Sequence, residues 1–110
     1  AREGLIEGKT IALVDEAIFT GTTLKVICDI CKACDVKKIY ICIPTPPCYN
    51  RCEQYMRPER ELLSSYVKEE ELKNYFKVAQ IFFQSFEVFV ASLHNIDAIC
   101  YECFERTRRI

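Results

Sequence analysis

The chain has 110 residues, about the size of one domain, and half of them are hydrophobic, which is enough to build a core. Fifteen Lys and Arg against sixteen Asp and Glu give a formal charge of −1, which excludes a strongly basic nucleic-acid module and an acidic disordered tail. No apolar run approaches the roughly 20 residues of a membrane helix, and the polar N-terminus carries no signal peptide. We expect one domain, or part of one, in the cytoplasm, with neither nucleic acid nor membrane as a partner.

Three elements near the start of the chain predict a strand–helix–strand unit. Thr10–Val14 is short, apolar and β-branched, which is typical of a strand that a parallel sheet buries on both faces. Apolar residues at helical spacing predict a helix over Thr22–Ala33, and Lys38–Ile43 predicts a second buried strand. Short links between the three favour a right-handed βαβ unit. The expected fold class is therefore α/β, a parallel sheet with flanking helices.

The second half of the chain carries weaker signals. A proline-rich stretch, Pro44–Pro47, ends the second strand. The elements expected after it are two short surface helices, a third strand and a last helix capped by a serine: Arg57–Ser65, Lys68–Tyr75, Val78–Phe83, and Ser85 to Leu93. The last helix has to run back along the sheet, so we expect the C-terminal cysteines to lie beside the loop that follows the second strand.

The loop between the first strand and the first helix carries the most chemistry. Asp15 and Glu16 stand at the carboxyl end of the strand, where open α/β sheets bind ligands. The helix then opens with Thr-Gly-Thr-Thr at 20–23, whose hydroxyls and N-terminal amides suit a phosphate, while Gly21 allows φ > 0 and a close backbone approach. Carboxylates beside a phosphate can accept hydrogen bonds from a sugar diol or hold Mg²⁺ through its waters. Together these groups describe a site for a ribose 5-phosphate.

Other interpretations of this loop remain open from the residues alone. Asp and Thr are common loop and cap residues. An acidic strand end is also found in the Mg²⁺ pocket of receiver-type domains. A P-loop is excluded, because no Gly-Lys-Ser/Thr follows the turn.

The stretch 14–23, Val-Asp-Glu-Ala-Ile-Phe-Thr-Gly-Thr-Thr, resembles the motif that binds phosphoribosyl pyrophosphate (PRPP) in type I phosphoribosyltransferases. Further matches make the chain similar to the amidophosphoribosyltransferase family in particular. These matches are Glu7-Gly8-Lys9, Pro46-Pro47, Glu61-Leu62, Glu70-Glu71-Leu72, Ser85-Phe86-Glu87 and Cys100-x-x-Cys103-Phe104. They run from about Glu7 to Phe104 and correspond only to the second half of that family's transferase domain.

The resemblance implies a partial type I phosphoribosyltransferase fold, with residues 1–110 as the C-terminal half of the domain, a PRPP loop at 11–23 and a C-x-x-C segment at 100–104. Asp15 and Glu16 would hold the ribose hydroxyls and the Mg²⁺ bound to PRPP. The turn at 20–23 would cradle the 5-phosphate. The substrate-binding residues implied are Asp15, Glu16, Ala17, Thr20, Gly21, Thr22 and Thr23. Two of them depart from the family pattern: the family usually has Ser where this chain has Ala17, and Arg where this chain has Thr20.

The activity that the resemblance implies is a glycosyl transfer that opens de novo purine synthesis. Ammonia derived from glutamine attacks C1 of PRPP, pyrophosphate leaves, and 5-phosphoribosylamine forms. The glutaminase that makes the ammonia needs an N-terminal Cys, whereas this chain begins with Ala1. Because the pyrophosphate-binding half is missing as well, we expect the 110 residues alone to be inactive and to need a preceding segment or an oligomeric partner.

Two alternatives to a catalytic role stay open. One is a non-catalytic module of phosphoribosyltransferase type that senses PRPP or a nucleotide. The other is a metal-binding or structural remnant with neither activity.

Eight cysteines are spread over the chain. A disulfide scaffold is not expected, because the chain has its own core and no signal peptide. The C-x-x-C of Cys100 and Cys103 is a weak metal signal alone, since a tetrathiolate site needs two more ligands. By resemblance, Cys52, Cys100 and Cys103 match three of the four ligands that hold a [4Fe–4S] cluster in the iron–sulfur branch of the family, and the fourth would lie upstream.

The other cysteines have simpler explanations. The C-x-x-C-x-x-C at 28–34 could be a ferredoxin-like loop, but apolar residues at 24, 27 and 30 continue the helix, which favours small thiols on its packed face. Cys42 is expected to be buried in its strand, and Cys48 has no assigned role. His94, the single histidine, is expected at a helix end and not as a catalyst.

Overall fold

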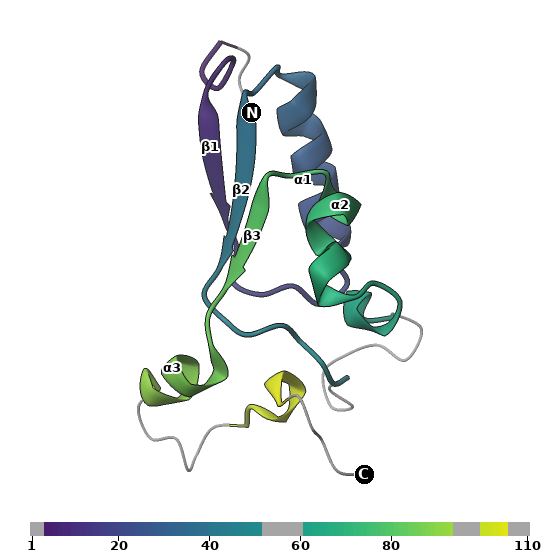
Figure 1. Cartoon of the computed structure of the whole chain (residues 1–110), viewed down its shortest axis with the longest axis vertical. Helices are drawn as coiled ribbons and strands as arrows, with labels where there is room; N and C mark the ends of the chain where they lie inside the picture. Colours follow the sequence, from purple (N-terminus) through teal and green to yellow (C-terminus); the bar gives the residue numbers. More distant parts are fainter. Residues whose placement is uncertain (1–3, 52–60, 94–99, 106–110) are drawn as a thin grey trace.

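The computed structural model describes residues 4–51, 61–93 and 100–105, and their framework is a parallel sheet of three strands in the order β1-β2-β3. The helices and strands are β1 (Thr10–Val14), α1 (Thr22–Ala33), β2 (Lys38–Ile43), α2 (Leu72–Phe76), β3 (Gln80–Phe83) and α3 (Phe86–Ala91), as Figure 1 shows. Thr10 pairs with Lys38, and Tyr40 pairs with Gln80. The expected fold class, an α/β parallel sheet with flanking helices, is confirmed.

The first three elements have the expected bounds, but β1 is less buried than expected. It lies at the edge of the sheet, with Thr10, Ala12 and Val14 exposed on one face. Val14 keeps 75% of its surface accessible. The prediction of a strand buried on both faces was therefore wrong, because α1 and α2 both cover the same face of the sheet and leave Thr10, Ala12 and Val14 accessible on the other.

In the second half of the chain, the helices and the strand are shorter than the sequence predicted. Of the helix expected over Arg57–Ser65, the first four residues lie outside the described part of the chain, and the remainder forms only a 3₁₀ turn at Leu63–Ser65. The next expected helix begins as a 3₁₀ turn, Glu69–Glu71, and continues as α2. Lys77 then adopts a left-handed conformation (φ 56°), which ends α2 and leaves only four residues for β3.

Ser85 caps the last helix as expected. Its hydroxyl oxygen accepts a hydrogen bond from the amide of Val88 at 3.2 Å, which satisfies one of the donors that a helix start leaves unpaired. The helix ends at Ala91, two residues earlier than predicted.

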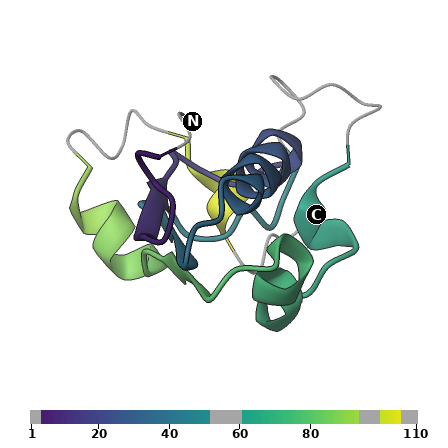
Figure 2. The same cartoon turned by 90° about the horizontal axis from the view of Figure 1, so that it is seen from above.

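The core lies between one face of the sheet and the helices α1 and α2. Figure 2 shows both helices on the same side of the sheet, with α3 displaced to the other side. The buried core side chains come from β2, from α1 and from the segment around α2, and include Ile39, Ile41, Ile43, Leu24, Cys28, Cys31, Leu63, Leu72 and Phe76. On the opposite face Val14, Cys42 and Phe82 stand in register across the three strands, and Phe82 remains 53% exposed.

Two lysines of α1 fasten α2 to the core. The ammonium of Lys25 donates to the carbonyl of Tyr75 at 2.9 Å, and that of Lys32 donates to the carbonyl of Phe76 at 2.6 Å. Both carbonyls belong to the last turn of α2, where helix carbonyls lack intrahelical partners and a positive charge is favourable. Among the described residues, no helix is long and apolar enough to span a bilayer.

The cysteines of α1 are packing residues. Cys28 is completely buried and Cys31 is 4% exposed, so the packed-thiol interpretation is confirmed for both. Cys34 is half-buried at the C-cap, and the left-handed residue that ends the helix is Asp35 (φ 58°). Cys42 is half-buried rather than fully buried as expected, because it faces the open side of the sheet.

Burial raises the pKa of the Cys28 thiol above its ordinary value, and nearby Lys32 only partly opposes this effect. The neutral thiol is the form that the fold favours. The neutral thiol therefore makes its full stabilising contribution below the pKa that the Cys28 thiol has in the unfolded chain, about 8.5. This contribution is lost as the pH rises through the higher pKa that the thiol has in the folded protein. We expect the free energy of unfolding to fall from about pH 8.5 upward, and to fall less steeply in Cys28→Ala.

The measurement is urea denaturation at a series of pH values between 7 and 10. Val26→Ala, a change at an exposed, non-ionisable position of the same helix, serves as the control and should keep the parent's slope. Equal slopes for Cys28→Ala and the parent would contradict the assignment.

Candidate functional site

The loop with the two acids and the Thr-Gly turn lies at the carboxyl edge of the sheet, between the end of β1 and the start of α1 (Figure 1). The amide of Asp15 donates to the carbonyl of Cys42 at the end of β2, at 3.4 Å. The carboxylate of Asp15 accepts a hydrogen bond from the amide of Glu16 at 2.8 Å. The Asp15 side chain is thus oriented by the amide of the next residue, while the Glu16 side chain is exposed. All seven residues that the sequence singled out lie in this loop and the first turn of α1: Asp15, Glu16, Ala17, Thr20, Gly21, Thr22 and Thr23.

The start of α1 has the features of an anion site. Gly21 is the N-cap residue in a left-handed conformation (φ 76°), and its carbonyl accepts the first helical hydrogen bond, from Lys25, at 2.9 Å. The Thr20 hydroxyl oxygen accepts hydrogen bonds from the amide and the hydroxyl of Thr22, at 3.5 and 3.3 Å. The first turn holds no acidic residue. The amides of this turn carry the positive end of the helix dipole, so they can receive a phosphate.

Gly21 also packs against a hydrophobic support below the loop. A Cβ atom at this position would lie 2.9 Å from Leu63 Cδ2 and 3.2 Å from Phe76 Cζ. The amide of Leu63 donates to the carbonyl of Phe19 at 2.8 Å, so Leu63 holds the loop at two points. Leu63 and Phe76 are almost completely buried. This support could not be predicted from the sequence, because the contact joins segments more than 40 positions apart.

The predicted cluster ligands are only partly described. Cys52 lies outside the described residues. Cys100 is exposed, and Cys103 is half-buried within a 3₁₀ turn at Glu102–Phe104. The carbonyl of Cys103 accepts hydrogen bonds from the amides of Tyr49 and Asn50, at 2.8 and 3.0 Å. The C-terminal segment (residues 100–105) therefore returns to the loop after β2 as expected, but the expected cause was wrong, because α3 lies beyond the carboxyl ends of the strands instead of running back along the sheet (Figure 1).

Metal-binding side chains do not gather elsewhere in the part of the chain that the structure describes. No group of three or more His, Cys, Asp or Glu side chains within it could hold a metal ion. Cys48 is buried, and its thiol donates to the carbonyl of Asn50 at 3.4 Å. His94 lies outside the described residues.

Comparison with known proteins identifies the family. The family model "Phosphoribosyl transferase domain" matches residues 1–87. The chain belongs to this family. Curated relatives named amidophosphoribosyltransferase match most of its length: enzyme 2 of Arabidopsis thaliana chloroplasts is 29% identical over 104 residues, and that of Methanocaldococcus jannaschii is 30% identical over 105. Each alignment covers 92% of this chain, so the resemblance predicted from the motifs is confirmed.

Solved structures agree on the fold of this phosphoribosyl transferase chain. The glutamine PRPP amidotransferase of B. subtilis, complexed with ADP and GMP, superposes with a TM-score of 0.81 over 94% of this chain, at 24% sequence identity. A structure described as the allosteric regulatory enzyme of purine biosynthesis gives a TM-score of 0.79 over 93% of the chain. The chain spans only 18% and 22% of the two curated relatives and 24% of the B. subtilis enzyme.

Replacing Gly21 by Ala should cost more stability than the same change at another left-handed glycine. Gly8 also has a positive φ (72°), but a Cβ there would meet nothing within 4 Å. Gly8→Ala should therefore show backbone strain alone, about 1–2 kcal/mol. Gly21→Ala adds overpacking against Leu63 and Phe76, which costs about 1–3 kcal/mol more. Urea denaturation of the two variants measures the difference, and equal losses would contradict the support described for Gly21.

Proposed function

We propose that this chain is part of an amidophosphoribosyltransferase and supplies the ribose-5-phosphate side of its transferase site. The observation that carries the proposal is the loop at 15–23: two carboxylates at a strand end, followed by a left-handed glycine at the start of a helix. The names of the curated relatives favour this enzyme over other phosphoribosyltransferases. In the complete enzyme, ammonia from glutamine would displace pyrophosphate from C1 of PRPP.

In this proposal the loop binds and orients the sugar phosphate. The amides and hydroxyls of Thr22 and Thr23 donate to the 5-phosphate, and the left-handed backbone of Gly21 opens the helix so that these amides face the ligand. Asp15 and Glu16 accept hydrogen bonds from the ribose hydroxyls. Holding the ribose at both ends fixes C1 for attack, and catalysis by such a site depends on positioning and electrostatics because no covalent nucleophile is needed.

We also propose Mg²⁺ as a cofactor, held through Asp15 and Glu16. The two carboxylates are adjacent at the strand end, and no third protein ligand joins them within the described residues. This donor set fits Mg²⁺, which usually keeps several waters and takes its remaining ligands from one or two carboxylates and substrate phosphates. When bound, Mg²⁺ would neutralise charge on the pyrophosphate that leaves. Asp15 would contribute through a carboxylate already oriented by the amide of Glu16.

A second metal proposal concerns the cysteines. We propose that Cys52, Cys100 and Cys103 are three ligands of a [4Fe–4S] cluster. The support is the pair of hydrogen bonds from Tyr49 and Asn50 to the Cys103 carbonyl, which brings the chain that leads to Cys52 alongside the C-x-x-C. The donor chemistry fits, since thiolates are the usual ligands of iron–sulfur clusters.

A non-catalytic sensor of PRPP or a nucleotide is the second candidate. Two departures from the family pattern favour this candidate: Ala17 and Thr20 stand where the family usually has Ser and Arg. A changed phosphate loop can alter the affinity or the regulation of the site while the site still binds PRPP. Retained PRPP affinity without turnover in the full-length protein would support the sensor. Release of pyrophosphate from PRPP in the presence of ammonia would support the enzyme.

The double variant Asp15→Asn/Glu16→Gln should weaken binding of Mg²⁺·PRPP to the full-length protein by at least about tenfold, which corresponds to about 1.4 kcal/mol. The amides keep the shape of the loop but remove the charge and half of the acceptors. Isothermal titration calorimetry measures the affinity. The matched control, Glu70→Gln/Glu71→Gln, removes two charges from exposed positions beside α2 and should bind normally. Parent-like affinity in the Asp15/Glu16 variant would overturn the ribose and Mg²⁺ assignments.

The full-length protein purified without oxygen should contain iron and inorganic sulfide, and Cys103→Ser should lose most of both. The reason is that an oxygen ligand replaces a thiolate that the cluster requires. Cys34→Ser, at the C-cap of α1, is the control and should retain iron. An iron-free parent, or iron that survives replacement of each of the three proposed ligands in turn, would leave the cysteines as packing residues.

A further inference from the structure

The side chain of Asn50 joins the loop after β2 to the C-terminal segment. Its amide nitrogen donates to the carbonyl of Glu102 at 2.8 Å and to the carbonyl of Glu105 at 2.6 Å. Both protons of the Asn50 amide group are therefore used on two carbonyls on either side of Cys103, one within its 3₁₀ turn and one just after it. The backbone amides of Tyr49 and Asn50 add two further hydrogen bonds between the two segments, both to the Cys103 carbonyl.

The loop is itself anchored on its other side. The hydroxyl of Ser64 donates to the carbonyl of Cys48 at 2.7 Å, and the Cys48 thiol donates to the carbonyl of Asn50 at 3.4 Å. Cys48 is only 3% exposed. Asn50 is thus part of a loop that is fixed to the core through the segment containing Leu63. The hydrogen bonds of the Asn50 side chain therefore hold the C-terminal segment in a fixed position relative to the core.

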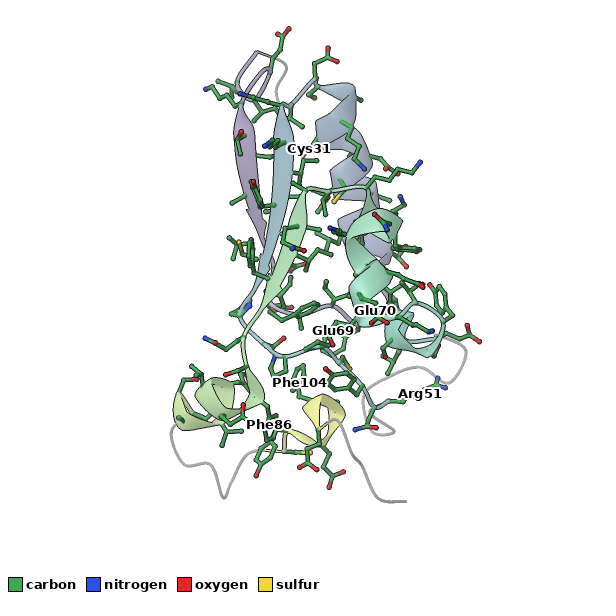
Figure 3. The ribbon with its side chains drawn as sticks, viewed as in Figure 1. Cys31, Arg51, Glu69, Glu70, Phe86 and Phe104 are labelled. Carbon is green, nitrogen blue, oxygen red and sulfur yellow. The ribbon has the colours of Figure 1, made fainter. Side chains whose placement is uncertain are left out.

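Aromatic contacts also hold the C-terminal segment against α3 and the loop after β1. The ring of Phe104 lies 5.2 Å from that of Phe89 and 6.3 Å from that of Phe19, and Tyr101 lies 5.8 Å from Phe86. Phe86 and Phe104 line one cleft of about 670 Å³, and Figure 3 shows them on neighbouring elements. Ring packing of this kind is weakly directional in comparison with two hydrogen bonds from one planar amide.

We propose that Asn50 is a positioning residue for the C-x-x-C segment: its side-chain amide fixes the backbone on both sides of Cys103 and so orients that thiol before any metal binds. The proposal deepens the cysteine site described under Proposed function and rests on it for its purpose. The orientation itself depends only on the described hydrogen bonds and can be measured without metal.

The test uses the full-length protein in two arms. In the first, metal-free reduced protein is alkylated with iodoacetamide, and the modification rate at each cysteine is followed by peptide mass spectrometry. Asn50→Asp keeps the shape of the side chain but cannot donate when ionised. It should raise the rate at Cys103 on the order of tenfold, as loss of one to two net hydrogen bonds predicts for a local opening. The rate at Cys100, already exposed, should stay within about twofold, and the fully buried Cys28 reports any global unfolding.

Asn74→Asp is the matched control. It makes the same chemical change at an exposed position of α2, and the Cys103 rate should equal that of the parent. Asn50→Ala is the second variant, and it removes the donors without adding a charge. It should also raise the Cys103 rate. A rate at Cys103 that is unchanged in both Asn50 variants overturns the positioning role.

The second arm measures the metal site. Protein purified without oxygen is exposed to an iron chelator, and iron loss is followed by absorbance. Faster loss in Asn50→Ala than in Asn74→Asp supports the proposal. If the parent contains no iron but Cys103 is alkylated faster in the Asn50 variants than in the parent, the positioning role is supported and the cluster assignment is overturned, so the two failures are distinguishable. Iron loss that is equal in all variants, with equal alkylation, overturns both the role of Asn50 and its link to the site.

Discussion

The packing of β2 against α1 is the interaction on which the rest of this structure depends. β2 is the central strand, and its inward side chains, Ile39, Ile41 and Ile43, are all buried. Burial of each such side chain contributes about 1.5–3 kcal/mol, which is more than a typical neutral hydrogen bond and comparable to one made by a charged group. Because β2 pairs with both neighbours in parallel, its position sets the register of β1 and β3 and brings all three carboxyl ends to one edge.

The chemistry gathers at that edge for the same reason. The acidic loop follows β1, the proline-rich loop with Asn50 follows β2, and α3 and the C-terminal segment follow β3. Leu63 and Phe76 extend the core beneath Gly21, so the helix start that could receive a phosphate stands on packed side chains. The lysines of α1 complete this arrangement by holding the last carbonyls of α2. A loop with such support needs little reorganisation when a ligand binds.

Local signals were sufficient for the first half of the chain and insufficient for the second. The bounds of β1, α1 and β2 followed from apolar periodicity and from the Thr-Gly turn, which act over a few residues. The left-handed Lys77 and Asp35 were not foreseen, because nothing about these residue types demands φ > 0. The seven loop residues were found from their chemistry and a family motif. Two sets of contacts were not predicted: that of Leu63 with Gly21, and those of Asn50 with Glu102 and Glu105. They join distant segments through side-chain packing and backbone carbonyls, which the sequence does not reveal.

The strand order also has a consequence for synthesis of the chain on the ribosome. Tyr40 pairs with Gln80, which is made 40 positions later (80 − 40). At about 5–20 residues per second, the far edge of β2 waits roughly 2–8 s for its partner after β1, α1 and β2 have emerged. During that interval the strand presents unpaired amide and carbonyl groups to any neighbouring nascent chain. The short β3 therefore has a protective role although it has only four residues. It pairs with the amide and carbonyl groups on the edge of β2 that β1 leaves free.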